Sequence, residues 1–440
     1  MLIEWPSDSG ARHGRSGQFS GHAPRRVTHA NIKATPPAAR PVTDRCSPGE
    51  GPPIGPVESA VPAETGRRYA NGGSPVRRLC MLLITHQCNL NCVYCYESYK
   101  SDQSMPVGLA RRIIEAEFDA VARSEQFDEL AIDFMGGEPL IRFDLIREIA
   151  EWTWSAPRPV PYIISATTNG TLLDDESKPW FRLHRQRFYL CLSLDGTPGM
   201  HDTNRGHSWG RIDLPFFQET WPDQPVKMTV SHHTIGSLAE GIIYLQERGF
   251  KVGASLGQGM PWNDGSIAEF GRQLRQLAEY YLEHEQVPPV SLLDLPIRHL
   301  RFSPGLAPRK YCGTGTHMAT YDVDGKAYPC HLFTPLVLGP ARSGELPAID
   351  FREDTSVADP RCHDCILQRL CPTCYGFNYK LAGHVALRDQ ILCRLFKVQA
   401  SANCWFQTQK LRHKRRVGVL SAEDARTAKA CLKMMEQLAV

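Results

Sequence analysis

Several features that define large classes of protein are missing from this sequence of 440 residues. It contains no apolar run long enough to cross a bilayer, and no signal peptide with a charged start and an apolar centre. Its formal net charge is only +3 and 22% of its residues are charged, so bulk charge does not indicate nucleic-acid binding. We therefore expect a cytoplasmic protein whose partners are neither membranes nor nucleic acids.

Cysteine, by contrast, is abundant, because the chain contains 15 of them. In the absence of an export signal, ligation of metals or clusters is favoured over a framework of disulfides, since thiols stay reduced in the cytoplasm. The odd number of cysteines also fits ligation better than pairing.

The first part of the chain, residues 1–76, differs in composition from the rest. It is rich in Pro, Gly, Ser, Arg and Ala and has no sustained hydrophobic period. Such a segment cannot bury enough apolar surface to offset the entropy of ordering it, so we predict a disordered extension. A transit peptide and a start codon placed too far upstream are the alternative explanations.

From Leu79 onward, short apolar runs typical of buried strands alternate with segments of helical period. The expected strands are 79–85, 130–134, 162–168, 188–194, 226–231 and 251–256, and the expected helices are 107–121, 143–154, 174–183, 238–248 and 266–283. This alternation implies parallel strands with helical crossovers. We predict an α/β fold with a partial (β/α)6 barrel over 77–285, whose active site lies at the carboxyl ends of the strands. Cys80 and Cys191 fall inside expected strands and are predicted to be core residues.

A cysteine triplet follows the first expected strand. Cys88, Cys92 and Cys95 form a C-x3-C-x2-C pattern, with the aromatic Tyr94 directly before the last cysteine. Three thiolates are one ligand short of saturating a 4Fe–4S cluster, which leaves one iron free to bind another molecule. Zinc ligation and simple burial are the alternatives, although zinc sites favour C-x2-C pairs completed by a fourth ligand, which this loop lacks.

Turn sequences with polar or glycine residues follow the next three expected strands. Residues 135–139, MGGEP, follow the second strand, and their two glycines allow the backbone to approach a ligand closely. Residues 168–170, TNG, end the third strand, and residues 193–196, SLDG, end the fourth. Each sequence is also suited to an ordinary turn, but each lies where a barrel places its ligand-binding residues.

These motifs, in this order, resemble the radical SAM superfamily, whose signature is C-x3-C-x-aromatic-C followed by GGEP after the second strand. The resemblance implies that Cys88, Cys92 and Cys95 hold a radical-generating 4Fe–4S cluster, and that its open iron chelates S-adenosylmethionine. It further implies a set of cofactor-binding residues, namely Tyr94, Gly136, Gly137, Glu138, Pro139, Asn169, Ser193 and Asp195.

The chemistry implied by this resemblance is reductive cleavage of S-adenosylmethionine to a 5′-deoxyadenosyl radical, which takes a hydrogen atom from the substrate. The electron would come from an external donor of the flavodoxin or ferredoxin type. A further stretch, His201-Asp202-x-x-Arg205, resembles one found in a large subgroup with extra clusters. Arg205 is expected to pair with a carboxylate, either of the cofactor or of a peptide.

A second cysteine field, after residue 306, resembles the SPASM domain. The resemblance implies two auxiliary 4Fe–4S clusters. One would be held by Cys362, Cys365, Cys371 and Cys393. The other would be held by Cys312, Cys330 and Cys374, either with one iron left open or with His317 or His331 as a further ligand. The chain departs from the family pattern in one gap, where Cys371 and Cys374 are separated by two residues instead of three. Paired C-x2-C motifs are also typical of structural zinc sites.

We therefore predict a radical SAM barrel at 77–285, a SPASM-type domain at 286–400 and a helical tail at 401–440, with a helix over 422–438. The predicted function is modification of a peptide or protein side chain, with a ribosomal precursor peptide as the favoured substrate. Formylglycine formation in a sulfatase is an alternative, disfavoured because His331 stands where those relatives have an Asp base. A small-molecule substrate and a zinc-stabilised interaction protein are further alternatives. Arg205 and His331 are the additional catalytic candidates.

Overall fold

The computed structural model describes residues 75–297, 312–352, 357–368 and 370–438. The predicted disordered extension therefore lies outside the described residues, apart from its last two positions. The described residues belong to one compact unit. In the part of the chain that the structure describes, no helix is both long enough and apolar enough to span a membrane.

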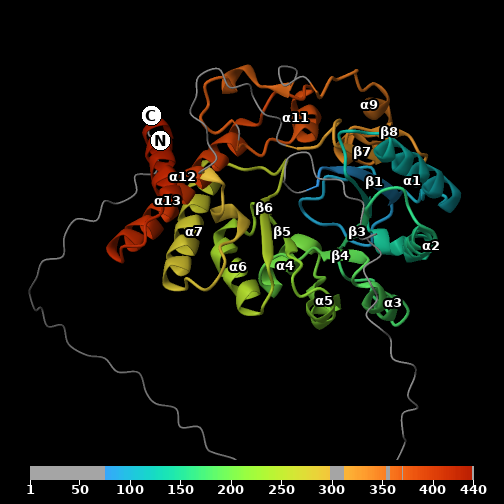
Figure 1. Cartoon of the computed structure of the whole chain (residues 1–440), viewed down its shortest axis with the longest axis horizontal. Helices are drawn as coiled ribbons and strands as arrows, with labels where there is room; N and C mark the ends of the chain where they lie inside the picture. The colour runs from blue at the N-terminus through green and yellow to red at the C-terminus, as the bar shows by residue number, and fades with distance from the viewer. Residues whose placement is uncertain (1–74, 298–311, 353–356, 369, 439–440) are drawn as a thin grey trace, which may run out of the picture. The chain divides into compact units, whose positions relative to one another are not determined.

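Six parallel strands build the first half of this unit, and all six were predicted. They are β1 (Arg77–Thr85), β2 (Glu129–Gly136), β3 (Tyr162–Thr168), β4 (Phe188–Leu192), β5 (Val226–Val230) and β6 (Val252–Leu256). β1 to β4 pair in one sheet and β5 with β6 in another. A bridge between Ser193 and Lys227 joins the two sheets, and the Leu194 N–H donates to the Lys227 carbonyl at 2.9 Å. The strands therefore follow one another from β1 to β6 as in a partial barrel (Figure 1).

The helices between these strands lie along their outer side (Figure 1). The predicted ones are α1 (Val107–Ala122), α2 (Phe143–Trp154), α3 (Ser177–His184), α6 (Leu238–Glu247) and α7 (Asp264–Glu283). Unpredicted are α4 (Pro198–Arg205), α5 (Leu214–Thr220) and the short η1 (Pro139–Arg142), η2 (Trp209–Arg211), η3 (Ile235–Ser237) and η4 (Ser291–Leu293). α3 begins later than expected because the Asp174 carboxylate accepts from the Ser177 N–H at 2.8 Å, forming a turn before the helix.

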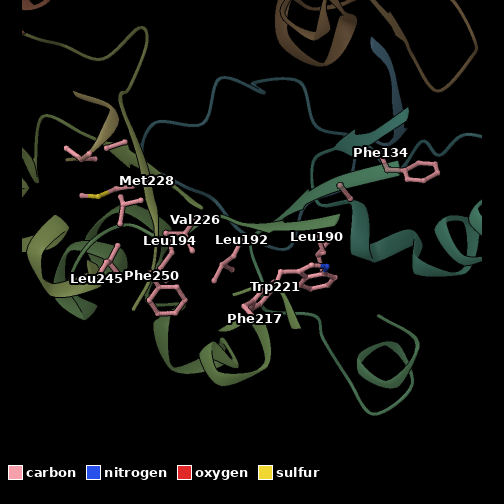
Figure 2. Close-up of a cluster of buried hydrophobic side chains, with 14 of the residues drawn as sticks. Phe134, Leu190, Leu192, Leu194, Phe217, Trp221, Val226, Met228, Leu245 and Phe250 are labelled. Carbon is pink, nitrogen blue, oxygen red and sulfur yellow. The ribbon is translucent and has the colours of Figure 1, made fainter. Parts of the chain in front are cut away.

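The core of the barrel lies between the strands and these outer helices. Leu190 and Leu192 of β4 and Val226 and Met228 of β5 are buried among apolar side chains that include Phe217 (Figure 2). Since side chains alternate along a strand, the residues between them point to the opposite face. We call this opposite face the inner face of the barrel.

The inner face carries polar side chains. Asp133 of β2, Thr167 of β3, Cys191 of β4 and Lys227 of β5 all alternate with buried apolar residues. The prediction that Cys80 is a core residue is confirmed, because it is fully buried. The same prediction for Cys191 is wrong: its thiol is half-buried, because the strand register places it on the inner face.

The cysteine-rich region is attached to the barrel through the sheet, which the sequence did not predict. β7 (Met318–Tyr321) pairs parallel with β1, and β8 (Ala327–Tyr328) pairs antiparallel with β7. The strand order is β4-β3-β2-β1-β7-β8. The remaining short helices of this region are η6 (His331–Phe333), α8 (Pro335–Leu338), α9 (Pro340–Gly344), η7 (Pro360–Cys362) and α11 (Tyr375–Ala382).

Two helices close the chain. The predicted helix over 422–438 is confirmed as α13 (Ala422–Leu438). Before it, α12 (Gln390–Arg416) runs without interruption through residue 400, where we had placed a boundary, and packs against α7 and α13. Cys404 of α12 and Cys431 and Met434 of α13 are buried in one apolar cluster between these helices, where Cys404 Sγ donates to Met434 Sδ at 3.8 Å.

Candidate functional site

The predicted cysteine triplet lies in the loop between β1 and α1, at the carboxyl end of β1. Cys88, Cys92 and Cys95 are half-buried free thiols. Burial, and to a smaller extent the neighbouring Cys95 and Cys88, raises the pKa of Cys92 to about 11. Cys92 therefore lies within electrostatic reach of the other two thiols of the triplet.

The glycines of the GGEP turn bring β2 into direct contact with this cysteine loop. The Gly137 N–H donates to the Thr85 carbonyl at 3.1 Å, and the Glu138 N–H donates to the Gln87 carbonyl at 2.8 Å. A Cβ atom at Gly137 would lie 2.1 Å from the Gln87 carbonyl oxygen and 2.9 Å from the Cβ of Cys88. Only a residue without a side chain fits between β2 and the loop.

This packing leads to a prediction for Gly137→Ala. The added methyl group must displace the backbone that carries Cys88, so we expect the variant to lose the iron held by the triplet and to keep the iron of the second cysteine field. Iron content and the cluster absorption spectrum after anaerobic reconstitution measure this. Gly199→Ala is the matched control, because no atom lies within 4 Å of a Cβ there. Full iron loading in Gly137→Ala would contradict the prediction.

Glu138 ties the GGEP turn to the end of β3. Its buried carboxylate accepts from the Thr168 hydroxyl at 2.7 Å, from the Asn169 N–H at 2.8 Å and from the Leu140 N–H at 3.1 Å. Burial is the main cause that raises the pKa of Glu138, and these hydrogen bonds oppose it. Glu138 therefore orients the turn from within the protein; its contact with the cofactor stays a prediction.

Two loop residues that the sequence analysis did not single out hold the triplet in place. The Asn169 side-chain amide donates to Asn89 Oδ1 at 2.8 Å, and Asn89 lies between the first two cysteines. Lys100 Nζ donates to the Leu90 carbonyl at 3.0 Å. Neither residue belongs to a recognisable motif, so only the three-dimensional contacts reveal them.

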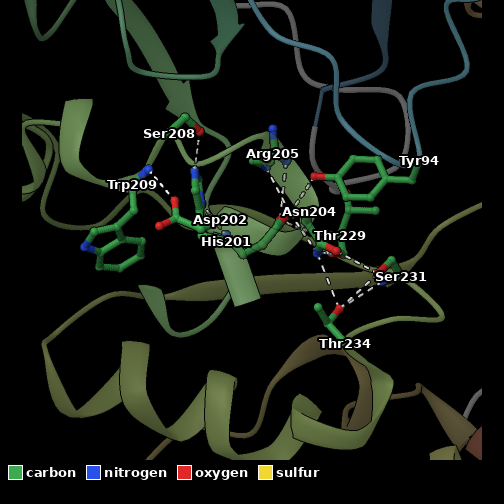
Figure 3. A network of polar contacts seen from close by, with 11 residues as sticks. Tyr94, His201, Asp202, Asn204, Arg205, Ser208, Trp209, Thr229, Ser231 and Thr234 are labelled. Carbon is green, nitrogen blue, oxygen red and sulfur yellow. Dashed lines mark hydrogen bonds and ion pairs between the residues drawn. The ribbon is translucent and has the colours of Figure 1, made fainter. Parts of the chain in front are cut away.

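A buried ion pair between Asp195 and Arg205 forms the centre of a polar network below the cysteine loop. Arg205 Nε lies 3.0 Å from Asp195 Oδ2, and the Asp195 side chain is fully buried. The same carboxylate accepts from the Tyr94 hydroxyl at 2.5 Å and from the Thr229 N–H at 2.9 Å. Figure 3 shows Tyr94, Arg205 and Thr229 converging on this point from the loop, α4 and β5.

The ion pair bears on two of the predicted roles. Arg205 pairs with an acid of its own chain, although we expected a carboxylate of the cofactor or of a peptide. Asn204 adds a second link, since its carbonyl accepts from the Val93 N–H of the cysteine loop at 2.9 Å and its amide donates to Asp195 at 3.2 Å. The unpredicted helix α4 therefore anchors the loop. Cofactor binding by Tyr94, Ser193 and Asp195 stays a prediction.

His201 lies in the same network and is fully buried. Its Nδ1 accepts from the Asp195 N–H at 3.3 Å, and its Nε2 lies 3.0 Å from the Ser208 hydroxyl (Figure 3). Burial, followed by the Arg205 charge, lowers the pKa of His201 to about 4, against the opposing effect of Asp195 and Asp202. The folded protein therefore holds this imidazole neutral.

The lowered pKa predicts how stability depends on pH. The unfolded chain takes up a proton on His201 below pH 6.5, whereas the folded protein does so only near pH 4. The contribution of His201 is therefore complete above pH 6.5 and is lost as the pH falls toward 4, by about 3 kcal/mol in total. The free energy of unfolding in urea, measured at several pH values between 6.5 and 4, should fall less steeply with falling pH for His201→Asn than for the unaltered protein. His413→Asn, at an exposed position, is the control, and its free energy of unfolding should depend on pH as that of the unaltered protein does. The same pH dependence in His201→Asn would contradict the prediction.

Cysteines of the second field act on one another's pKa at two places. Burial, and then Cys374 and Cys312, act to raise the pKa of Cys330 to about 12. Separately, Cys371 has a pKa of about 11, raised by burial and by its three neighbours Cys393, Cys365 and Cys362. The thiols at each place thus lie near one another. Their role as cluster ligands stays a prediction.

No group of three or more His, Cys, Asp or Glu side chains among the described residues is arranged to hold a single metal ion. The ligands of one ion converge on one point, whereas the thiolates of a 4Fe–4S cluster bind iron atoms at different corners of a cube.

The two candidate histidines of this region lie in different surroundings. The His317 ring packs edge-on against Phe127, with ring centres 5.5 Å apart. His331 lies 5.5 Å from the ring of Tyr96, and its buried Nδ1 has no hydrogen-bond partner in the described structure. Burial, followed by the charge of Lys227, lowers the pKa of His331 to about 4.

Tyr96 connects the cysteine triplet to the second cysteine field. It directly follows Cys95, and its ring packs edge-on against Phe377 at 5.9 Å. Its carbonyl accepts from Lys380 Nζ at 2.8 Å. The loop that carries the triplet is therefore held by the barrel on one side and by the cysteine-rich region on the other.

With this geometry established, similarity to known proteins decides the family. Residues 82–212 match the Radical SAM superfamily. The chain contains a radical SAM domain. The matched segment spans β1 to η2 and includes the triplet, the GGEP turn and the Asp195–Arg205 pair.

Individual relatives match the radical SAM domain over a part of their length. The uncharacterized protein MJ0907 of Methanocaldococcus jannaschii is 30% identical over 116 residues, which are 26% of this chain and 38% of that protein. The antilisterial bacteriocin subtilosin biosynthesis protein AlbA of Bacillus subtilis is 31% identical over 126 residues, which are 28% of this chain and 25% of that protein. The chain thus spans well under half the length of the curated relatives that it matches.

Among solved structures, a histidine-tagged form of anSMEcpe with bound AdoMet superposes with a TM-score of 0.57 at 16% identity, over 81% of this chain and 99% of that one. A likeness at this low identity shows the fold. It extends far beyond the radical SAM domain and confirms the predicted fold class.

Proposed function

We propose that this protein is a radical SAM enzyme with two auxiliary clusters, and that it modifies a side chain of a peptide or protein. The observation that carries the proposal is the placement of three free thiols on one short loop at the carboxyl end of β1, with Cys88 directly against the Gly136–Gly137 turn. This is the edge at which a β/α barrel performs its chemistry. The two further thiol groups of the SPASM-like region support the auxiliary clusters.

The residues of the triplet fit a 4Fe–4S cluster. They are free, half-buried thiols, and a cluster supplies the positive charge that deprotonates a ligating thiol. When bound, the cluster and S-adenosylmethionine supply one-electron cleavage of the sulfonium and abstraction of a hydrogen atom.

The chain itself positions and encloses this chemistry. Glu138, Asn169 and the Asp195–Arg205 pair hold the cysteine loop from the barrel side. Tyr96 closes the other side of the loop. Rigid support of this kind keeps reacting atoms in register and keeps water away from them.

His331 is the residue that we propose to exchange a proton with the substrate. The proposal rests on position, because its Nδ1 is buried, has no hydrogen-bond partner in the described structure and lies on the segment that follows Cys330. A neutral imidazole nitrogen without a partner has a lone pair that can accept a hydrogen bond from a substrate N–H or O–H, which is the contact that proton exchange requires.

A peptide or protein substrate is favoured by two similarities. AlbA is named for bacteriocin biosynthesis. Native anSMEcpe has been solved with AdoMet and a Cp18Cys peptide bound, and it superposes on this chain with a TM-score of 0.55. A ribosomal precursor peptide is the substrate that we propose. We also propose a flavodoxin-type or ferredoxin-type protein as the electron donor.

Anaerobic reconstitution with iron and sulfide tests the proposal. We expect a brown protein with about three 4Fe–4S clusters per chain, which releases 5′-deoxyadenosine from S-adenosylmethionine under a strong reductant. Iron analysis, the absorption spectrum and chromatography of the nucleoside measure this. A colourless chain that binds zinc alone and releases no 5′-deoxyadenosine would favour a zinc-stabilised interaction protein instead.

A further inference from the structure

The inner face of the barrel carries a polar arrangement that the radical-forming site does not use. The Ser165 hydroxyl donates to Asp133 Oδ1 at 2.7 Å, and Lys227 Nζ donates to the Thr167 hydroxyl at 2.7 Å. Asp133, Ser165, Thr167 and Lys227 come from three different strands, β2, β3 and β5. The fold therefore gathers them on one face, although they are far apart in the sequence.

Lys227 carries an ammonium that no carboxylate of the described residues pairs with. Lys178, Lys251 and Lys414 each form an ion pair with an aspartate, at 2.9, 2.8 and 2.8 Å. Lys227 is exposed, and within the described residues its ammonium bonds to the Thr167 hydroxyl without any carboxylate in ion-pair distance. An ammonium has three donors, so at least two remain free.

The position of Lys227 connects this ammonium to the reaction site. Its backbone bridges to Ser193, directly after β4, at the edge where the radical SAM domain places its cofactor residues. Its charge also acts on Asp133 and on Cys191 of the neighbouring strands. The ammonium thus lies within electrostatic reach of the inner face of the barrel.

We infer that Lys227 binds a carboxylate of the substrate, so that the modified peptide presents an Asp or Glu side chain, or its C-terminal carboxylate, to the inner face of the barrel. This inference rests on the proposed function, because it names the substrate class of that same site. The Thr167 hydroxyl accepts from Lys227 and is left with its own proton to donate to the same carboxylate.

The neighbouring charges are compatible with such a ligand. Asp133 is the acid of the inner face that could compete with a substrate carboxylate for Lys227. It forms no ion pair with Lys227, and its Oδ1 accepts from the Ser165 hydroxyl. Burial is the main cause that raises the pKa of Asp133. A charge-assisted hydrogen bond from an unpaired ammonium is among the stronger polar interactions available in a binding site, and it discriminates an acid from its amide.

Peptide pools that differ in one charge test the inference. Holoenzyme with S-adenosylmethionine is dialysed anaerobically against acetylated, amidated pentapeptides whose central residue is Asp or Glu, and against pools with Asn or Gln there. Mass spectrometry of the retained peptides gives their relative affinities. We expect the acidic pools to be favoured by about tenfold, Lys227→Met to abolish the preference, and Lys227→Glu to favour pools with central Lys or Arg.

The controls separate this inference from its alternatives. Lys251→Met removes a lysine that pairs with Asp223 outside the inner face, and should keep the acidic preference. If the unaltered enzyme retains the acidic and the amide pools equally, whether both bind or neither binds, the inference is overturned. An acidic preference that survives in Lys227→Met overturns it as well. If the inference is overturned and Lys227→Met also weakens binding of S-adenosylmethionine, Lys227 binds the carboxylate of that cofactor instead. Release of 5′-deoxyadenosine is measured in the same preparation, and its absence alongside an intact acidic preference would contradict the proposed radical chemistry alone.

Discussion

Replacing Cys92 by alanine is expected to reduce cleavage of S-adenosylmethionine to the background rate measured without enzyme. Cys92 is the central member of the triplet, and its thiol lies near both Cys88 and Cys95. A cluster held by two thiolates exposes a second iron and is easily lost, so the cofactor would have no site with one open iron. The measurement is the rate of 5′-deoxyadenosine release under excess reductant.

The auxiliary iron should survive this change, because the two groups of the second cysteine field do not include Cys92. We therefore expect iron content to fall by about one third, with the remaining absorption of the auxiliary clusters retained. Cys80→Ala is the matched control: this fully buried thiol lies in β1 just before the loop and belongs to none of the three groups. If the Cys92 variant cleaved the cofactor at an undiminished rate, the assignment of the triplet would be refuted.

The second large effect is expected for Arg205→Met. This change leaves Asp195 fully buried without its counter-ion, and the loss of one partner from a buried ion pair destabilises a protein by about 3–5 kcal/mol. Because the same carboxylate binds the Tyr94 hydroxyl, the cysteine loop should loosen as well. The free energy of unfolding in urea, measured on the metal-free protein, gives the size of the loss.

A double variant identifies the cause of that loss. In Asp195→Asn combined with Arg205→Met, no uncompensated charge is buried, so we expect part of the lost stability to return. Lys251→Met breaks an exposed ion pair with Asp223 and should leave the free energy of unfolding nearly unchanged. A change that small in Arg205→Met would show that the buried pair does not organise the site.

The repeating pattern of the barrel could be predicted because each strand and helix is defined by the residues within it. Each of β1 to β6 is a short apolar run, and the outer helices carry a regular apolar spacing. The elements that escaped prediction are those whose stability comes from distant partners. β7 has four residues and owes its place to pairing with β1, which lies more than two hundred positions earlier in the chain. α4 is a short polar helix, held by Asp195 and by the cysteine loop.

The error at Cys191 has a similar origin. A cysteine inside an apolar run is usually a core residue, and the run itself was correctly predicted as a strand. Which face a residue occupies depends on the register against β3 and β5, and one position decides between the core and the inner face. Lys227 was overlooked for the same reason, since nothing near it in the sequence marks it as the residue that faces Thr167.

The sequence by itself determined the chemistry of this protein: three thiols in one tight loop, a glycine turn after the next strand, and a second set of cysteines whose spacing predicts two groups. These features are local, because a few neighbouring residues suffice to define them. The tertiary structure alone decided what supports and surrounds that chemistry. Asp195 with Arg205, Asn89 with Asn169, Tyr96 beside His331, and the unpaired ammonium of Lys227 are contacts between separate elements. Their formation depends on how strands and loops are brought together in space, which no local pattern records.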